Sequence, residues 1–164
     1  MEQTRKSVLI TWLWAGLLVG TLDLAAALLQ FMWRSGRDPF IVLRFIASGV
    51  FGPAAFAGPS SMIWYGLLFH FLFAFGFTLA FLLIYPRLGI LRRRPFVTGF
   101  IYGIFVWLVM NLVVLPFAGI KIKGQFDLSE ILTGILILTL AIGLPLAFIA
   151  KWLYDKGSKR TIEN

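Results

Sequence analysis

Four long apolar stretches constrain this chain more than any other feature of its sequence. They run over residues 7–33, 61–85, 95–117 and 128–154, and each is long enough to cross the ~30 Å hydrocarbon core of a bilayer as a helix. Hydrophobic residues make up 60% of the chain and charged residues 13%, unlike the composition of soluble domains. We therefore predict an all-α fold, an integral membrane four-helix bundle that forms a single transmembrane domain over residues 1–164.

The first apolar stretch could instead be a secretory signal peptide, because Ala25, Ala26 and Ala27 offer a small-residue cleavage site. However, the stretch is longer than the roughly 7 to 15 residues of a signal core, and it contains Asp23. We expect it to remain in the protein as a membrane anchor.

Residues 37–60, which connect the first two spans, are predicted to contain a short helix. Asp38 followed by Pro39 is typical of a helix N-terminus, so we expect a helix from Pro39 to about Val50. This helix should lie at the membrane interface or enter the membrane as a re-entrant segment.

A fifth span through residues 37–60 is the alternative. Two glycine–proline steps, at residues 52–53 and 58–59, oppose a continuous helix there. Arg44 would also lie inside hydrocarbon, at a cost of about 2.5 to 3.5 kcal/mol on the translocon scale. We therefore prefer four spans.

The distribution of basic residues predicts the orientation. The N-terminus, the connection between the second and third spans and the C-terminal tail together hold ten lysines and arginines, whereas the other two connections hold five. Cytoplasmic connections carry the excess of positive charge. Both termini and the loop with Arg92, Arg93 and Arg94 should therefore be cytoplasmic, in a bacterial inner (plasma) membrane.

A weak internal repeat agrees with this topology. Two sets of residues match at two different offsets: Gly16 and Gly20 with Gly99 and Gly103, and Gly76, Leu79, Ala80 and Phe81 with Gly143, Leu146, Ala147 and Phe148. They favour two parallel helix hairpins related by an axis along the membrane normal, with a site between them. The simpler explanation, which we prefer slightly, is chance similarity among the few residue types that membrane helices use.

Few polar side chains lie inside the spans, and they fall at similar depths. At 1.5 Å per helical residue, Asp23, His70 and Asn111 lie roughly 15, 13 and 9 Å from the outer boundary. Thr133 lies near the same level, and Arg44 could reach it if residues 37–60 fold inward. We expect these five residues to form a polar layer in the outer half of the bundle, where they are our candidate binding residues.

Asp23 makes the strongest individual case. It belongs to a helix face of small and polar residues, namely Gly16, Gly20, Asp23, Ala27 and Gln30, and such a face packs inward. The carboxyl group should then be neutral or paired with His70 or Arg44. We expect Asp23 and His70 to be in direct or water-bridged contact. The competing explanation is that the polar residues only make hydrogen bonds that hold helices together.

Catalytic motifs are almost absent from the sequence. The chain has no cysteine and one histidine, and it lacks an HExxH motif, a phosphate-binding loop and a GxSxG motif. We therefore predict no catalytic residue, no metal site and no cofactor, and we lean against an enzyme.

The expected partners are membrane lipids and a small-molecule or lipid ligand. The net charge of +8 could suggest nucleic acid, but the basic residues lie at the ends of the apolar stretches and form no stripe. The glycine pairs predict close packing inside the bundle, and homo-oligomerisation is the alternative that stays open.

Short motifs along most of the chain resemble a family of small, uncharacterised bacterial inner-membrane proteins of four helices. They are Gly20-Thr21-Leu22-Asp23, residues 46–52, Leu68-Phe69-His70-Phe71, Val109-Met110-Asn111 and Gly143-Leu144-Pro145. The resemblance includes Asp23, His70 and Asn111, and it implies no particular activity.

These features predict a bundle that binds or passes a small solute, a proton or a lipid group at the polar layer. A structural or accessory subunit without a ligand is the first alternative. A membrane enzyme that uses Asp23 and His70 as an acid and base on a lipophilic substrate is the second.

Overall fold

The structure is a computed structural model that describes residues 2–119 and 127–160, with side chains for residues 7–119 and 127–155. Every regular element in those two ranges is helical. The prediction of an all-α fold is therefore confirmed.

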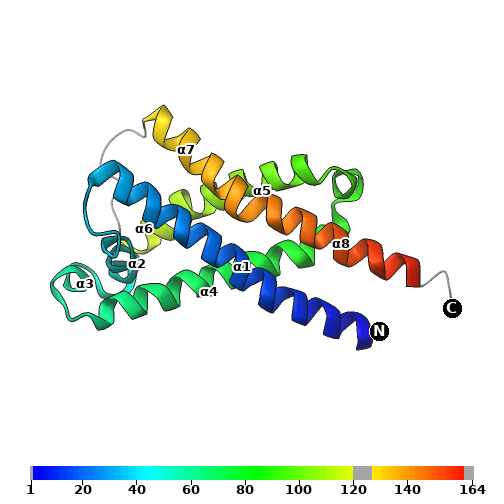
Figure 1. Ribbon diagram of the computed structural model, residues 1–164, viewed down its shortest axis with the longest axis horizontal. Helices are drawn as coiled ribbons and strands as arrows, with labels where there is room; N and C mark the ends of the chain where they lie inside the picture. The colour runs from blue at the N-terminus through cyan, green and yellow to red at the C-terminus, as the bar shows by residue number, and fades with distance from the viewer. Residues whose placement is uncertain (1, 120–126, 161–164) are drawn as a thin grey trace.

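Four helical rods dominate the fold (Figure 1). The first is α1 (Glu2–Ser35), and the second is α4 (Ser61–Ile84), which continues into the 3₁₀ turn η1 (Tyr85–Arg87). A second 3₁₀ turn, η2 (Gly89–Arg93), leads from η1 to the third rod.

The third and fourth rods each contain a π-helical turn. The third consists of α5 (Pro95–Val109), the π-helix η3 (Met110–Val114) and α6 (Leu115–Phe117). The fourth consists of α7 (Leu128–Leu138), the π-helix η4 (Thr139–Gly143) and α8 (Leu144–Arg160).

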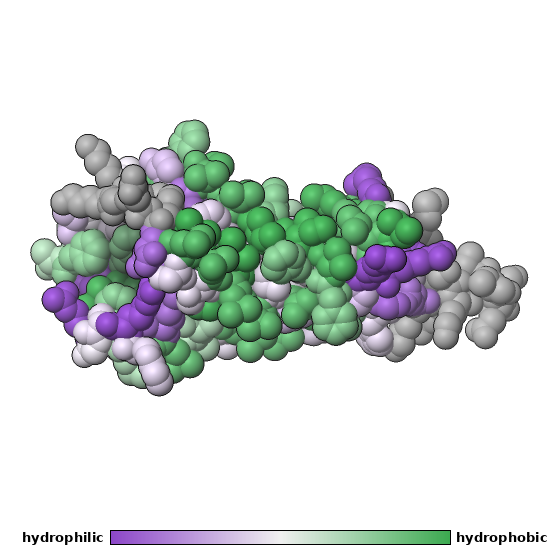
Figure 2. All heavy atoms as spheres, turned by 90° about the horizontal axis from the view of Figure 1, so that it is seen from above, coloured by the Kyte–Doolittle hydropathy of each residue, from purple (hydrophilic) through white to green (hydrophobic). Residues whose placement is uncertain are grey.

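Within the described residues, four stretches are long and apolar enough to cross a membrane. They are Ser7–Ser35, Ser61–Arg87, Pro95–Phe117 and Leu128–Asp155, within three residues of the predicted limits. Figure 2 shows the corresponding band of hydrophobic residues across the middle of the molecule, with hydrophilic residues gathered toward both ends.

The connection between the first two rods folds into two short helices, α2 (Ile41–Phe51) and α3 (Ala54–Ala57). The predicted short helix is confirmed, with limits moved by one or two residues. With 11 residues, α2 is too short to cross a bilayer. The turn after α2 requires a glycine, because Gly52 has a φ of 60°.

The two ends of the bundle differ in what they carry (Figure 1). The start of α1, the end of α8 and the η1–η2 turns lie at one end, which we call the η end. The α2 and α3 helices lie at the opposite end, which we call the α2 end. This arrangement is the one that an even number of crossings requires.

The four rods pack as two hairpins. In the first hairpin α1 packs along α4, and in the second α5 packs along α7, η4 and α8. The hairpins meet where α1 packs on η4 and α8. Two tyrosine hydroxyls also join them, since Tyr102 donates to the Phe77 carbonyl at 2.6 Å and Tyr154 donates to the Leu82 carbonyl at 2.8 Å.

The tightly packed core belongs to the η end. Phe81 and Tyr102 lie with ring centroids 4.5 Å apart, and Tyr85 stacks on Tyr154 at 5.6 Å. Phe81, Tyr85 and Leu146 are among the fully buried side chains of this cluster. The α4 and α5 helices are therefore held together toward the η end, which leaves room between them toward the α2 end.

The sequence Asp127-Leu128-Ser129-Glu130 at the start of α7 has the spacing of a capping box. Asp127 is indeed the N-cap, and its carboxylate accepts hydrogen bonds from the backbone N–H and the hydroxyl of Ser129. Glu130 instead forms an ion pair with Arg34 at the end of α1, with a distance of 3.4 Å. Both partners are exposed, so this pair contributes little stability.

Candidate functional site

A cavity of about 780 Å³ lies between the two hairpins toward the α2 end. Its wall receives residues from α1, α2 and α4 on one side, and from the α5–η3–α6 rod and the α7–η4 junction on the other. The volume falls within the range of about 300 to 1,000 Å³ that is typical of small-molecule sites.

The cavity wall is almost entirely apolar. Its apolar members are Val42, Phe45, Ile46, Gly49 and Val50 from α2, Phe69, Leu72, Phe73, Ala74 and Phe77 from α4, and Val106, Met110, Val113, Val114, Leu115, Phe117, Ala118, Leu138 and Ile142 from the second hairpin. Among the described residues that line it, only Asp23 and His70 have polar side chains. The structure thus brings together the two residues with the strongest sequence-based case.

His70 bridges the two helices of the first hairpin. Its Nε2 lies 2.8 Å from the backbone carbonyl oxygen of Gly20 in α1. A carbonyl oxygen can only accept a hydrogen bond, so Nε2 carries the hydrogen in this contact. The edge-on ring of Phe71, with its centroid 5.4 Å away, packs against the imidazole. The orientation of the imidazole is therefore held from two sides.

Asp23 lies one helical turn beyond Gly20 on α1, which places it beside the His70 contact. The carboxyl group and the imidazole are therefore neighbours on the cavity wall. Within the described part of the chain, however, the Asp23 carboxylate takes part in no hydrogen bond and no ion pair of its own. A half-buried carboxylate between apolar helices is costly without a partner.

The mouth of the cavity is lined by exposed apolar side chains. Leu72 of α4 is 66% exposed, Val50 of α2 is 65% exposed and Val113 of η3 is 46% exposed, although all three line the cavity. These residues lie within or beside the stretches that are long enough to cross a membrane. The opening therefore faces the side of the bundle where lipid hydrocarbon would lie.

Both π-helical turns contribute to the cavity wall. The η3 turn supplies Met110, Val113 and Val114, and the η4 turn supplies Ile142. A π turn adds a residue to a helical turn and changes the direction of the side chains around it. Such turns occur frequently at functional sites. Here they shape the apolar wall opposite Asp23 and His70.

Asn111 and Thr133 are not among the residues that line the cavity. The Asn111 amide donates to the Trp107 carbonyl one turn earlier in its own helix, at 2.9 Å. The Thr133 hydroxyl likewise donates to the Ser129 carbonyl at 2.6 Å. Each satisfies its polar group locally, so the expected layer of five polar residues contracts to Asp23 and His70 at the cavity.

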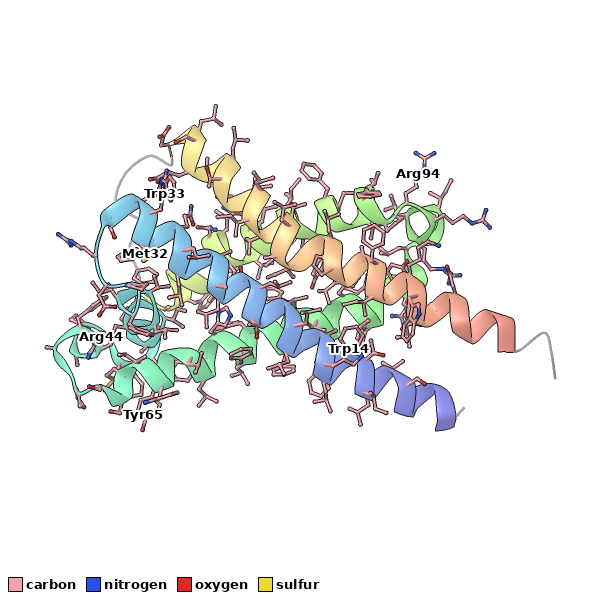
Figure 3. All side chains as sticks on the ribbon, viewed as in Figure 1. Trp14, Met32, Trp33, Arg44, Tyr65 and Arg94 are labelled. Atoms are coloured by element: carbon pink, nitrogen blue, oxygen red, sulfur yellow. The ribbon has the colours of Figure 1, made fainter. Side chains whose placement is uncertain are left out.

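Arg44 also has partners elsewhere. Its guanidinium donates to the carbonyls of Ala55 and Gly58, each at 2.9 Å, and so ties α2 to the end of α3. Figure 3 shows Arg44 among the short helices of the α2 end. The expectation that Arg44 reaches the polar layer is therefore not met, because the unpaired carbonyls of the short helix are nearer partners.

Sequence reasoning missed the contribution of α2. This helix packs so closely on α4 that a Cβ on Gly66 would overlap the carbonyl of Leu43. The same docking brings Phe45, Ile46 and Gly49 onto the cavity wall. The sequence of an apolar helix does not show which of its apolar residues will line a cavity. A hint lay in Gly66, since a glycine inside a helix often marks a close approach.

Metal binding finds no support in the described ranges, where no group of three or more His, Asp or Glu side chains lies close enough together to hold an ion. Comparison with protein-family models, with curated proteins and with solved structures finds no match for this chain.

Proposed function

We propose that this protein is a binding module of the bacterial inner membrane that holds a small lipophilic molecule or lipid group in the cavity between its hairpins. Both termini and the η end lie in the cytoplasm, and the α2 end lies at the outer face. The observation that carries the proposal is an apolar cavity of about 780 Å³ whose polar lining consists, in the described chain, of Asp23 and His70.

The chemistry of the wall favours a lipophilic ligand over a polar solute. A polar solute would leave most of its hydrogen-bonding groups without partners in this cavity, at a cost of about 1 to 3 kcal/mol for each group. The apolar body of a molecule that reaches the mouth from the bilayer gives up no water to enter it. The cavity thus resembles common ligand sites, which are mostly apolar with a few well-placed polar groups.

The test is to block the mouth of the cavity and to measure what the protein retains. In Val113→Trp the indole is placed on a residue that lines the cavity. In the matched control Leu112→Trp, it is placed on the neighbouring residue, which is 59% exposed and lies outside the cavity wall. Native mass spectrometry of protein released from nanodiscs should show bound lipophilic molecules on the wild type and on Leu112→Trp, but not on Val113→Trp.

Equal retention by Val113→Trp and Leu112→Trp would contradict binding in the cavity. Thermal unfolding of the two variants identifies any misfolded sample, because a tryptophan that only faces lipid leaves stability within about 0.5 kcal/mol of the wild type.

A purely structural role is the second candidate, and one observation favours it. The bond from His70 to the Gly20 carbonyl joins α1 to α4 at 2.8 Å, and such bonds contribute about 0.6 kcal/mol on average in membrane proteins. If this were the whole role of the site, His70→Phe would lower thermal stability and Asp23→Asn would change nothing. Ligand loss in Asp23→Asn at unchanged stability would reject the structural role.

The orientation is tested by labelling single cysteines, which is simple because the chain has no native cysteine. Arg94 projects from the η end in Figure 3, and Arg37 is exposed between α1 and α2. In intact cells a membrane-impermeant maleimide should label Arg37→Cys and spare Arg94→Cys. The reverse pattern would invert the topology.

A further inference from the structure

We infer that the ligand carries a hydrogen-bond donor, an ammonium or hydroxyl group on an apolar body, and that anionic lipophiles such as fatty carboxylates are rejected. The inference rests on the proposed binding function and names the class of ligand. It follows from counting donors and acceptors at the polar end of the cavity.

The His70 imidazole offers an acceptor to this site. Its Nε2–H is already donated to the Gly20 carbonyl. In a neutral imidazole the other nitrogen, Nδ1, then has a lone pair and no hydrogen. The contact with α1 therefore fixes the tautomer, and the tautomer fixes what the ring can offer to a ligand.

The Asp23 carboxylate offers acceptors as well. None of its hydrogen-bonding capacity is used by another described residue, whereas the backbone of its own helix is paired internally. An ammonium group beside Asp23 would hold the carboxyl group in its ionised form, and an ionised carboxylate accepts through both oxygens and donates through neither. Toward such a ligand, Asp23 and His70 therefore present several lone pairs and no competing donor.

The remaining wall supplies no donor to change this count. All of the other described lining residues have aliphatic or aromatic hydrocarbon side chains, a thioether or none at all. Arg44 precedes the lining residue Phe45 in the sequence, but its guanidinium donates to the carbonyls of Ala55 and Gly58. A carboxylate or phosphate would face Asp23 without any cation to neutralise it, which is unfavourable in a medium of low dielectric constant.

An ammonium or hydroxyl group, by contrast, is complementary to these acceptors. It donates to Asp23, and it can donate to Nδ1 of His70. The charge-assisted hydrogen bond from an ammonium group to the carboxylate is stronger than the hydrogen bond from a neutral hydroxyl group. Its apolar body would lie along the aromatic and aliphatic wall toward the mouth at Leu72 and Val113.

The experiment compares three probes that share a tail and differ in the head group: 1-aminodecane, 1-decanol and decanoate. Each is added to the wild type in nanodiscs at pH 7 at equal mole fraction in the bilayer, and the shift in the unfolding midpoint is measured. We expect stabilisation by 1-aminodecane and 1-decanol and none by decanoate. In Asp23→Asn the affinity for 1-aminodecane should fall roughly tenfold, because an amide is a neutral acceptor, whereas 1-decanol should bind nearly as before.

The single histidine of the chain gives a second, spectroscopic readout. In protein labelled with ¹⁵N-histidine and purified without a histidine tag, the free state should show a protonated Nε2 and an unprotonated Nδ1. Addition of 1-decanol should shift the Nδ1 resonance and leave Nε2 unchanged. A ring that is protonated on both nitrogens at pH 7 would place a donor in the site and overturn the inference.

The outcomes separate this inference from the proposed function. If decanoate binds as well as 1-aminodecane and Val113→Trp abolishes both, the cavity is a ligand site but its preference for donors is wrong. If the three probes act equally on the wild type and on Val113→Trp, they bind outside the cavity, and the proposed function fails with the inference. An unchanged affinity of Asp23→Asn for 1-aminodecane would also overturn the inference.

Discussion

The two hairpins use the same glycine spacing to build different interfaces. In the first hairpin, Gly16 and Gly20 of α1 receive the rings of Phe75 and Phe71 from α4. In the second, Gly99 of α5 lies directly against the backbone of Gly143 in η4. One interface is therefore filled by side chains that can rotate, and the other is formed by backbone that cannot.

This difference corresponds to a difference in what the hairpins bring to the cavity. The first hairpin supplies both polar groups, Asp23 and His70, together with the mouth residue Leu72. The second supplies apolar residues on the two π turns. A rigid wall thus faces a more adaptable one, which suits a site that must admit a ligand between them.

The largest effect should come from Gly143→Ala. The new Cβ would overlap the Gly99 carbonyl and crowd the Gly103 backbone nitrogen, and neither can move without separating α5 from η4. We expect a loss of about 3 kcal/mol, the upper part of the overpacking range, measured as the free energy of unfolding in detergent.

The matched control is Gly76→Ala, at the position that pairs with Gly143 in the sequence repeat. A Cβ on Gly76 meets nothing within 4 Å. Stability should stay the same or rise by up to about 1 kcal/mol, since alanine is the better helix former. Similar losses for both variants would show that the repeat extends to the packing and would remove the contrast between the hairpins.

A smaller effect is expected for Gly16→Ala in the first hairpin. The three atoms nearest to its Cβ would all belong to the ring of Phe75, a side chain that can shift more easily than backbone. We expect a loss of about 1 kcal/mol, the lower end of the overpacking range. Combination with Phe75→Leu should recover part of that loss in a double-mutant cycle, and a purely additive cycle would indicate that the interface is as rigid as the second one.

Two buried threonines, one taken from each hairpin, give the next comparison. The Thr139 hydroxyl in η4 is buried without a hydrogen-bond partner among the described residues, whereas the Thr78 hydroxyl in α4 donates to the Ala74 carbonyl at 2.8 Å. Thr139→Val should raise the free energy of unfolding by about 1 kcal/mol, and Thr78→Val should lower it by about 0.5 kcal/mol. Destabilisation by both substitutions would indicate that Thr139 has a partner in the bilayer-embedded protein.

The smallest expected effect concerns the helix starts. Hydrogen bonds from the Ser129 side chain and backbone hold the pKa of the Asp127 carboxyl below its ordinary value of 3.8. Because the pKa is lower in the folded state, the cap stabilises α7 fully at pH values above the ordinary pKa. This stabilisation is lost as the pH falls through the lower pKa of the folded state. Amide exchange at the start of α7, corrected for intrinsic rates, should therefore accelerate on acidification.

In Ser129→Ala this acceleration should largely disappear. The start of α4 provides the internal reference, since Ser60 makes no side-chain cap hydrogen bond. An equal response of both helix starts to pH would assign the effect to general acid destabilisation.

Much of the fold could be predicted from the sequence, because hydropathy and chain length act locally. The four apolar stretches and the short helix before Gly52 appear within three residues of the expected limits. The cap at Asp127 can be read from the sequence for the same reason, since a cap depends on residues within one turn of it. Glu130 lies in the first turn of α7, as the capping spacing requires, but its carboxylate pairs with Arg34, which is distant in sequence.

The candidate site was predictable only in part. Polarity inside an apolar stretch singled out Asp23 and His70, and both line the cavity. The same rule also singled out Asn111 and Thr133, whose side chains instead bond to the preceding turn of their own helices. Depth along a helix can be counted from the sequence, but the direction of a side chain around the helix and its choice of partner cannot.

The sequence alone determined that the chain is helical and apolar enough to enter a bilayer, because a helix in hydrocarbon satisfies its own backbone and needs only about 20 apolar residues. Only the tertiary structure decided which glycines meet backbone and which meet rings, and where the cavity opens. Close packing depends on the shapes of residues far apart in the chain, such as Gly66 and Leu43 or Gly99 and Gly143. A glycine in a helix indicates that some close contact exists, but no local pattern encodes its partner, and these contacts are what leave Asp23 and His70 facing an open cavity.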